Sequence, residues 1–588
     1  MPQRTHTCGE LRKEDIGKEV ILEGWVAHRR DHGGVIFVDL RDRYGLTQVV
    51  FRPNTHPEAH RTADGLRSEY VVRVSGEVEP RLEGQENPKL ATGDIEIDGE
   101  KLEVLNAAAP PPFELDVHEA EAGEATRLKF RYLDLRRPRM QHNIAFRHRM
   151  WKEIRDFYDE EGFLEIETPF LAKSTPEGAR DFLVPSRIAH GHFYALPQSP
   201  QLFKQILMVS GFDKYFQIVR CFRDEDTRAN RSVEFTQLDV EISFADEEDV
   251  IENAERLLER LFRKLLDREL EPPLPRMTYA EAMARYGTDK PDTRFAMELV
   301  DVSELAARSE FNVFRSVVET GGQVVGLCAP GAAKLTRKEI DELGKFVGEF
   351  GAKGLAWFKV DESGLTSQIA KFFGEALQRK LIAGMGASPE DLLLFVADKP
   401  EVAQRAMGEL RLALGRQLHL IDTSEFKALW VTEVPLLFWN EEEQRYDSPH
   451  HPFTAPKPED ESLLDSDPLK VTSRAYDLVL NGEEIAGGSI RIHRAELQKK
   501  IFDLLKIGPE EAERRFGFFL RALTYGAPPH GGIAWGLERT LMLLLGEQSL
   551  REVIPFPKTQ RGQCPLTGAP SDVEKKQLRD LGLELSEE

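Results

Sequence analysis

The stretch CFRDEDTRANRSVEFTQLDVEISF (221–244) places charges of both signs between two apolar, strand-like segments. Alternate residues of a strand share a face. The second segment therefore predicts a half-buried strand that carries Asp239 and Glu241 on an acidic face. The first segment carries Arg223 where its strand ends, and antiparallel pairing is expected to set Asp239 near Arg223. The charged residues between the segments predict a long connecting loop.

This hairpin has the chemistry to hold a zwitterion and a polyphosphate together. Arginine grips a phosphate or a carboxylate through two parallel hydrogen bonds, and carboxylates hold an ammonium group or a divalent metal. A surface hairpin held by salt bridges explains the same charges when the segment is taken alone, since exposed ion pairs are common and contribute little.

Two further segments favour a binding site. In YDLVLNGEEIAGGSIRIHR (476–494), Asp477 lies on a strand, a predicted turn follows, and Glu484 comes next. Carboxylates at this spacing suit Mg²⁺, which prefers oxygen ligands. In PPHGGIAWGLERTLMLLLG (528–546), a glycine-rich strand enters an apolar helix with Arg539 in its first turn. That arginine can reach a planar ring or a terminal phosphate.

Composition limits the class of protein. A chain of 588 residues is too long for one core, so several domains are expected. Its net charge of −23 argues against non-specific coating of nucleic acid. The four cysteines are scattered, without a C-x-x-C pair, and the N-terminus lacks an apolar signal core. We expect a cytoplasmic protein without membrane segments.

Residues 19–105 predict three strands, a helix and two strands, which is the order of an OB barrel. Arg29 and Arg30 end the first strand, and Phe37 lies in the second. Aromatic and basic side chains on this face are how OB folds stack bases and hold phosphates. A generic small barrel, with Phe37 in its core, is the alternative.

The residues after the barrel predict a linker and then a larger region of helices and strands. Three prolines in NAAAPPPFELD (106–116) break regular structure. The basic run at 127–150 predicts either a solvated face or contact with a polyanion. A helix is expected over 142–161, followed by a strand, FLEIETPFL (163–171). Residues 288–421 predict an inserted α+β unit, and a polar tail with one short helix begins at Arg561.

Several motifs in this order resemble the bacterial aspartyl-tRNA synthetases, a family of class II aminoacyl-tRNA synthetases. GFLEIETP, FRDED…RSVEFTQLD and GLER resemble class II motifs 1, 2 and 3. The more specific signatures are TPEGARDFLVP, QSPQLFKQ, HHPFT and NGEEIAGGSIRIH. The resemblance extends over nearly the whole chain.

The resemblance implies a multidomain α+β protein that forms a homodimer, with Pro169 at the interface. It combines an N-terminal OB-fold barrel, an antiparallel-sheet catalytic domain and an inserted α+β domain. The implied boundaries are 1–106 for the anticodon-binding barrel, 107–141 for a hinge, 142–287 and 422–560 for the two catalytic parts, 288–421 for the insertion and 561–588 for a C-terminal extension.

The resemblance also implies an ATP-dependent ligase that forms aspartyl-adenylate with Mg²⁺, and it assigns residues by matched motif position. The catalytic residues are Arg223, Glu484 and Arg539. The L-aspartate site comprises Glu177, Ser199, Gln201, Lys204, Arg223, Asp239, His450, His451 and Arg491. The ATP site comprises Arg223, Asp224, Glu225, Ser232, Glu484, Gly536, Leu537, Glu538 and Arg539. The metal ligands are Asp477 and Glu484. Ser232 departs from the glutamine that is common in relatives, which leaves its nucleotide contact in doubt.

The implied anticodon contacts are Arg30, His32, Phe37, Gln48 and Gly84. His32 and Gly84 resemble the non-discriminating subset, which charges tRNA(Asn) as well as tRNA(Asp) and works with a tRNA-dependent amidotransferase. A strictly discriminating enzyme, with His32 a plain polar turn residue, is the alternative.

Three other functions fit parts of the sequence. A synthetase-like enzyme that makes asparagine would keep the catalytic core but could lose the barrel, which is present. A pure OB-fold nucleic-acid-binding protein would not carry Arg223, Glu484 and Arg539 in these contexts. An asparaginyl or lysyl relative stays open in principle, although two cations, Lys204 and Arg491, favour an anionic substrate.

Overall fold

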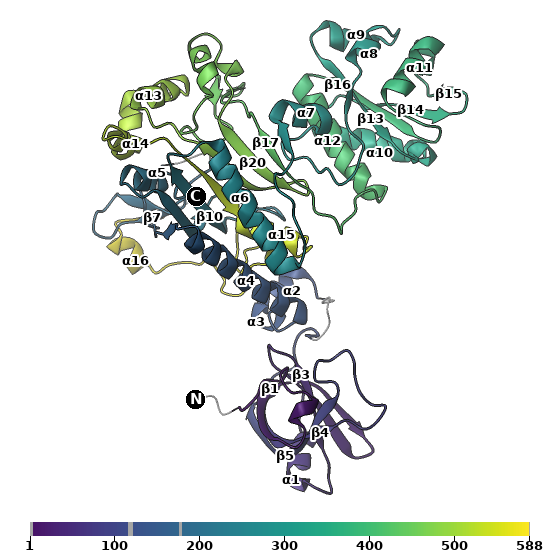
Figure 1. The fold of residues 1–588 in the computed structure, drawn as a ribbon, viewed down its shortest axis with the longest axis vertical. Coiled ribbons are helices and arrows are strands. Elements are labelled where there is room, and N and C mark those ends of the chain that lie inside the picture. Colours follow the sequence, from purple (N-terminus) through teal and green to yellow (C-terminus); the bar gives the residue numbers. More distant parts are fainter. Residues whose placement is uncertain (1–3, 116–121, 176–178, 587–588) are drawn as a thin grey trace. The chain divides into compact units, whose positions relative to one another are not determined.

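A computed structural model describes residues 4–115, 122–175 and 179–586 of the chain (Figure 1). The chain divides into two compact units. The first comprises residues 1–147, 551–559 and 563–571, and the second comprises 148–550, 560–562 and 572–588. Within the described ranges, no helix combines the length and the apolarity needed to cross a membrane.

Five strands of the first unit close into a barrel in the order β1-β2-β3-β5-β4. They are β1 (Glu19–His32), β2 (Val35–Arg41), β3 (Leu46–Phe51), β4 (Val71–Pro80) and β5 (Ile95–Asn106). Helix α1 (Pro57–Asp64) lies between β3 and β4 in the chain, so the predicted order of three strands, a helix and two strands is confirmed. Alternate residues such as Val26, Val38 and Val72 are buried and fill the barrel.

The basic run after the barrel folds two of its arginines, Arg131 and Arg137, inward, so the prediction of a solvated or polyanion-binding face is wrong for these two. It forms α2 (Glu124–Lys129), α3 (Arg131–Asp134) and the start of α4 (Pro138–Glu160). Arg131 and Arg137 are buried and bind Asp134 at 2.5 and 3.0 Å. Arg131 also donates to the carbonyl oxygens of Ile554 and Pro555. A buried carboxylate and buried carbonyl groups need these donors, which the sequence pattern alone does not reveal.

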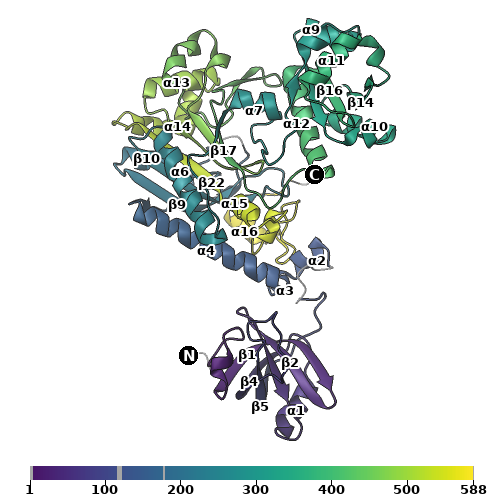
Figure 2. The ribbon, with the colours of Figure 1, turned by 45° about the vertical axis from the view of Figure 1, so that its right-hand side comes forward.

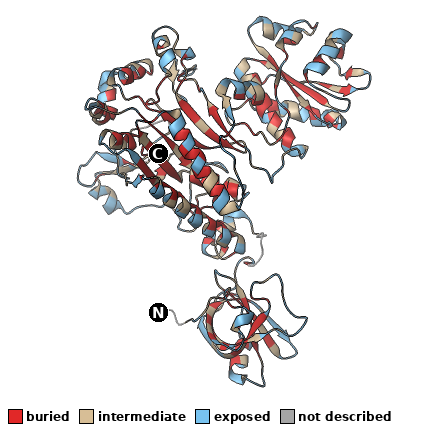
Figure 3. Ribbon diagram, viewed as in Figure 1, coloured by how far each residue is buried: buried red, intermediate tan, exposed pale blue. Residues whose placement is uncertain are grey.

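The second unit is built on a sheet of eight strands in the order β11-β17-β20-β21-β22-β10-β9-β6. Its strands are β6 (Leu164–Glu165), β9 (Lys214–Phe222), β10 (Glu234–Ser243), β11 (Arg276–Thr278), β17 (Ala428–Thr432), β20 (Ala475–Leu480), β21 (Glu483–Ile490) and β22 (His530–Gly536). The central neighbours pair antiparallel, as predicted, whereas β11 and β6 pair in parallel at the two edges. The central strands are largely buried (Figure 3).

Helices and two small hairpins surround this sheet. The helices are α5 (Gln201–Val209), α6 (Glu247–Leu261), α7 (Tyr279–Tyr286), α13 (Ala495–Leu504), α14 (Pro509–Leu523), α15 (Leu537–Leu544) and α16 (Lys575–Asp580). The hairpins are β7 (Leu183–Pro185) with β8 (Phe193–Ala195), and β18 (Phe438–Asn440) with β19 (Arg445–Asp447). Helices α4 and α6 lie side by side against the sheet in Figures 1 and 2, joined by a salt bridge between Arg260 and Glu153.

Two expectations for the charged hairpin need correction. Strand β10 is buried on both faces, including the acidic one, because Asp239 and Glu241 are paired with cations inside the protein. The hairpin register places Asp239 opposite Gln217 rather than near Arg223. Arg223 instead lies just beyond the end of β9, where its backbone N–H donates to the carbonyl oxygen of Val233.

The strand predicted over 163–171 is also much shorter than expected. Strand β6 spans Leu164–Glu165 and pairs with Tyr215 and Phe216 at the edge of the sheet. Proline cannot donate to a strand ladder, so Pro169 could not have extended the ladder, although β6 already ends four residues before it.

Residues within the predicted insertion form a second sheet, in the order β12-β13-β16-β14-β15. The strands are β12 (Val300–Asp301), β13 (Gln323–Ala329), β14 (Ala356–Asp361), β15 (Gly364–Thr366) and β16 (Leu392–Asp398), and the helices are α8 (Ser303–Ala307), α9 (Asn312–Glu319), α10 (Arg337–Gly348), α11 (Glu375–Gly384) and α12 (Pro400–Gln417). Leu394 of β16 joins one apolar core and Leu393 joins another, because alternate residues of this strand face opposite sides. Both faces of this sheet are therefore covered.

Candidate active site

A cavity of about 460 Å³ opens among β10, β21, β22 and the loop after β9. This size suits a small-molecule ligand, for which pockets of roughly 300–1,000 Å³ are usual. The predicted site residues that line it are Ser199, Gln201, Lys204, Arg223, Glu225, Ser232, Asp239, His450, His451, Glu484, Arg491, Gly536, Glu538 and Arg539. Folding thus brings together residues that lie more than three hundred positions apart in the chain.

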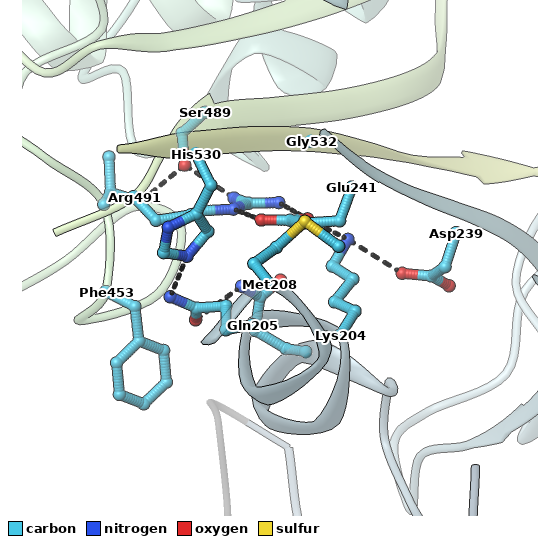
Figure 4. Close-up of polar contacts among 12 residues, drawn as sticks. Lys204, Gln205, Met208, Asp239, Glu241, Phe453, Ser489, Arg491, His530 and Gly532 are labelled. Atoms are coloured by element: carbon cyan, nitrogen blue, oxygen red, sulfur yellow. Dashed lines mark hydrogen bonds and ion pairs between the residues drawn. The ribbon is translucent and has the colours of Figure 1, made fainter. Parts of the chain in front are cut away.

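One end of the cavity is a buried network of two cations and two carboxylates (Figure 4). The Lys204 Nζ lies 3.0 Å from Asp239 Oδ1 and 3.3 Å from Glu241 Oε2. The Arg491 guanidinium donates to both Glu241 oxygens, at 2.9 and 3.2 Å. All four side chains are at most 2% exposed. Formal charges in the network therefore balance before any ligand is present.

The pKa values in this network follow from burial and from the opposite charges. Burial acts to raise the pKa of Glu241, but Arg491 and Lys204 outweigh it and lower that pKa to about 2. Burial raises the pKa of Asp239, against the opposing effect of Lys204. Burial lowers the pKa of His451 well below its usual value, and the neighbouring Arg491 lowers it further. His451 is therefore neutral at pH 7 and can accept the hydrogen bond from Arg491 Nη1, at 3.0 Å.

The network leaves donors and an acceptor for a ligand. Asp239 Oδ2 is buried and, among the described residues, has no hydrogen-bond partner, so it can accept from an ammonium group. Lys204 carries three N–H hydrogens and its partners in the described chain are the two carboxylates, which leaves one donor. A bound carboxylate would meet this donor and the remaining Nη2 hydrogen of Arg491.

The other end of the cavity has the features of a nucleotide site. The Arg223 guanidinium lies over the ring of Phe235, 5.0 Å from its centroid. Arg539 Nη1 donates to the backbone oxygen of Glu484, which fixes this arginine at the opening. Glu225 accepts from Arg231 at 2.7 Å. An aromatic ring with arginines beside it can stack a planar base and bind phosphate.

Asp477 and Glu484 converge above the backbone of Gly487, where the absence of a side chain leaves room. A Cβ on Gly487 would lie 2.7 Å from Asp477 Oδ1 and 3.3 Å from Glu484 Oε1. Asp477 Oδ1 is buried without a hydrogen-bond partner in the described part of the chain. Burial and the charge of Glu484 raise the Asp477 pKa well above its usual value. Two neighbouring carboxylates, one with an oxygen that has no hydrogen bond among the described residues, fit Mg²⁺, which proteins commonly hold by one or two carboxylates together with substrate phosphates.

Some predicted site residues lie outside the cavity, and some cavity residues were not predicted. Asp224, Asp477 and Leu537 do not line the cavity, and Glu177 lies outside the described residues. Glu538 lines the cavity but also accepts the backbone N–H of Thr236 at 2.7 Å, which ties α15 to β10. Phe235 and Gln237 line the cavity and were missed, as was Glu241 of the buried network, although all three share the strand face of Asp239, which was the available signal.

The predicted anticodon contacts lie on the outer face of the barrel. Arg30 donates to Asp39 at 2.8 Å and to Gln48 at 3.3 Å, while Gln48 donates to Glu96 at 2.9 Å. Phe37 is half-buried beside this network, and not in the barrel core. His32 is exposed and meets the Phe37 ring edge-on, with centroids 6.0 Å apart. Gly84 is exposed in a turn, with a φ of +79°.

Comparison with known proteins assigns the family. Residues 123–560 match the class II tRNA synthetases of the D, K and N group, and residues 20–105 match the OB-fold nucleic acid binding domain. The chain therefore belongs to the class II aminoacyl-tRNA synthetases. An Aquifex aeolicus relative is 55% identical over 100% of this chain and 99% of its own length, and a Moorella thermoacetica relative is 57% identical over 99% and 96%. Both are named aspartate–tRNA(Asp/Asn) ligase.

Solved structures agree with the fold. The asparaginyl-tRNA synthetase of Pyrococcus horikoshii in complex with asparaginyl-adenylate matches with a TM-score of 0.60 and 20% identity. The match covers 95% of this chain and 99% of the chain of that synthetase. At this identity the likeness concerns the fold alone.

Proposed function

We propose that this enzyme attaches L-aspartate to tRNA(Asp) and to tRNA(Asn) through an aspartyl-adenylate. The observation that carries the proposal is the buried pair of cations, Lys204 and Arg491, beside Asp239 Oδ2, which has no hydrogen-bond partner in the part of the chain that the structure describes. This arrangement suits a ligand with a side-chain carboxylate and an amino group. The names of relatives that match the chain end to end support the same substrates.

In the first step, the α-carboxylate of aspartate attacks the α-phosphorus of ATP and pyrophosphate leaves. A carboxylate is already ionised at pH 7, so the step needs no general base. Arg223 would offset charge on the α-phosphate, and Arg539 would hold the nucleotide, so catalysis is mainly positioning and charge stabilisation. Asp477 and Glu484 would hold Mg²⁺, which when bound supplies further positive charge to the phosphates.

In the second step, a terminal ribose hydroxyl of the tRNA attacks the carbonyl carbon of aspartyl-adenylate and AMP leaves. Residues 1–106 would hold the anticodon through Arg30, Phe37 and Gln48. We expect the inserted residues 288–421 to contact tRNA or to stabilise the fold. If Asp-tRNA(Asn) is made, an amidotransferase must convert it to Asn-tRNA(Asn) before its use in translation.

An exposed apolar surface supports a homodimer. Leu164, Phe170, Leu171 and Leu183 are between 47% and 57% exposed, close to Pro169 in the sequence or in the neighbouring hairpin. Exposed apolar surface of this kind commonly marks an interface. Light scattering should give the mass of a dimer for the wild type and of a monomer for a Leu171→Glu variant.

Pyrophosphate exchange and tRNA charging test the proposal. Exchange should depend on aspartate, and not on asparagine or lysine. Purified tRNA(Asp) and tRNA(Asn) should then accept labelled aspartate with comparable efficiencies. Charging of tRNA(Asp) alone would show a strictly discriminating enzyme, and exchange with lysine or asparagine would overturn the choice of amino acid.

A further inference from the structure

A row of hydrogen bonds runs behind the end of the cavity that contains the network of Lys204, Asp239, Glu241 and Arg491. Gln201 Nε2 donates to Gln205 Oε1 at 2.9 Å, and Gln205 Nε2 lies 3.1 Å from His530 Nε2. His530 Nδ1 lies 2.8 Å from the carbonyl oxygen of Pro528. Gln205 and His530 are 0% exposed and Gln201 is 4% exposed, so water does not compete for these groups. Figure 4 shows His530 and Gln205 pointing toward each other from β22 and α5.

The chemistry of these groups fixes the direction of every bond in the row. The Pro528 carbonyl can only accept, so His530 Nδ1 carries the proton. Burial lowers the pKa of His530, and the nearby Arg491 and His493 lower it while Glu241 opposes them. The ring is therefore neutral at pH 7, and its Nε2 accepts from the Gln205 amide nitrogen. The Gln205 oxygen is then free to accept from Gln201.

This direction decides which atom of Gln201 meets the ligand. Gln201 lines the cavity, and its nitrogen is already directed at Gln205. Its amide oxygen is the atom left for a ligand, and an oxygen accepts from an ammonium group. The opposite amide orientation would set N–H hydrogens against that ammonium, which is repulsive.

We propose that Gln205 and His530 are positioning residues, which orient the Gln201 amide so that its oxygen receives the amino group of the amino-acid substrate. The inference rests on the proposed function, since it takes the ligand to be an α-amino acid. Neither residue lines the cavity, so they act through Gln201.

Gln205→Met tests the row because methionine keeps the size of the side chain but neither accepts nor donates an amide hydrogen bond. The KM for aspartate in pyrophosphate exchange should rise by about 10- to 100-fold, as expected for one hydrogen bond to a charged group. The KM for ATP should change by less than about twofold. His530→Phe should give the same pattern. Gln205→Glu should keep the KM for aspartate close to that of the wild type, because burial favours the protonated carboxyl, whose O–H can donate to His530 Nε2 while its other oxygen accepts from Gln201.

Gln498→Met is the matched control. Gln498 is also fully buried and donates to a proline carbonyl, that of Pro452 at 2.7 Å, but it does not line the cavity. Its loss should lower thermal stability without a selective rise in the KM for aspartate. An unchanged KM for aspartate in both Gln205→Met and His530→Phe would overturn the proposal, as would a Gln205→Glu variant no better than Gln205→Met. If the wild type showed no aspartate-dependent exchange, the proposed function itself would fail.

Discussion

An arginine pairs with a carboxylate both in the cavity and on the outer face of the barrel, but the surroundings of the two pairs differ. Arg491 and Glu241 in the cavity are 2% and 0% exposed, whereas Arg30 and Asp39 on the barrel are 47% and 11% exposed. The cavity pair also has two further polar partners for Arg491, Ser489 and His451. The barrel pair is open to solvent on the side of the arginine.

This difference in exposure indicates which kind of ligand each site can bind. Buried charges lose hydration and depend on their partners, so removal of one partner is costly and the geometry is fixed. Exposed pairs contribute about 0–1 kcal/mol and rearrange easily. A cavity lined by buried, fixed charges suits strict selection of one small substrate. A face with exposed, adaptable charges suits a large ligand such as a nucleic acid.

The largest effect is expected from Arg491→Leu in the cavity. The change leaves the carboxylate of a bound aspartate in this buried site without its Arg491 donor, at a cost of about 3–5 kcal/mol, which corresponds to roughly a 10²- to 10⁴-fold loss. Aspartate-dependent pyrophosphate exchange should fall by that factor while circular dichroism stays unchanged.

A matched control separates burial from charge in this prediction. Arg474 forms a partly exposed pair with Glu247 away from the cavity, with side-chain exposures of 23% and 30%. Arg474→Leu should leave exchange within about threefold of wild type. Comparable activities of the two variants would contradict the contrast between buried and exposed pairs.

A smaller effect is expected on the barrel from Phe37→Ala. Loss of one base-stacking contact is worth about 1–3 kcal/mol, or about 5- to 150-fold in tRNA charging. Pyrophosphate exchange without tRNA should not change, because the barrel plays no part in that step. An equal fall in both reactions would show that Phe37 supports the fold instead.

His32→Leu tests the barrel face in a second way, because we expect it to alter the choice between the two tRNAs and not the overall affinity for tRNA. We expect the efficiency of tRNA(Asn) charging to fall roughly fivefold, which corresponds to about 1 kcal/mol, while the charging of tRNA(Asp) is little affected. Charging assays with the two purified tRNAs measure this ratio. An equal change for both tRNAs would remove His32 from anticodon selection.

The smallest expected effect is on stability in acid, and it concerns the cavity. Burial lowers the pKa values of His451 and His530 below the ordinary 6.5, so the folded state holds these rings neutral. The unfolded chain binds more protons once the pH falls below 6.5, and the free energy of unfolding decreases there. The Tm should therefore fall more between pH 7 and pH 5.5 in the wild type than in a His451→Asn variant. Equal falls would show that His451 does not contribute.

Local sequence patterns predicted much of the fold, whereas the family resemblance supplied most of the predicted residues that line the cavity. The barrel order, the turn between Asp477 and Glu484, and the strand that enters α15 are all confirmed. These features follow from strand periodicity and from glycine and proline positions, which act within a few residues. The register of the β9–β10 hairpin and the length of β6 were wrong, because both depend on which neighbours the strands meet.

The sequence by itself determined the inventory of charges, the family motifs and the order of the elements. Tertiary structure alone decided how those charges are balanced. Glu241 pairs with Arg491, which lies 250 positions away and directly after β21, and Arg131 is buried against backbone oxygens from the far end of the chain. Such partners are set by the cost of burying an unpaired charge. That cost exists only once the chain has folded and excluded water, so no local pattern records it.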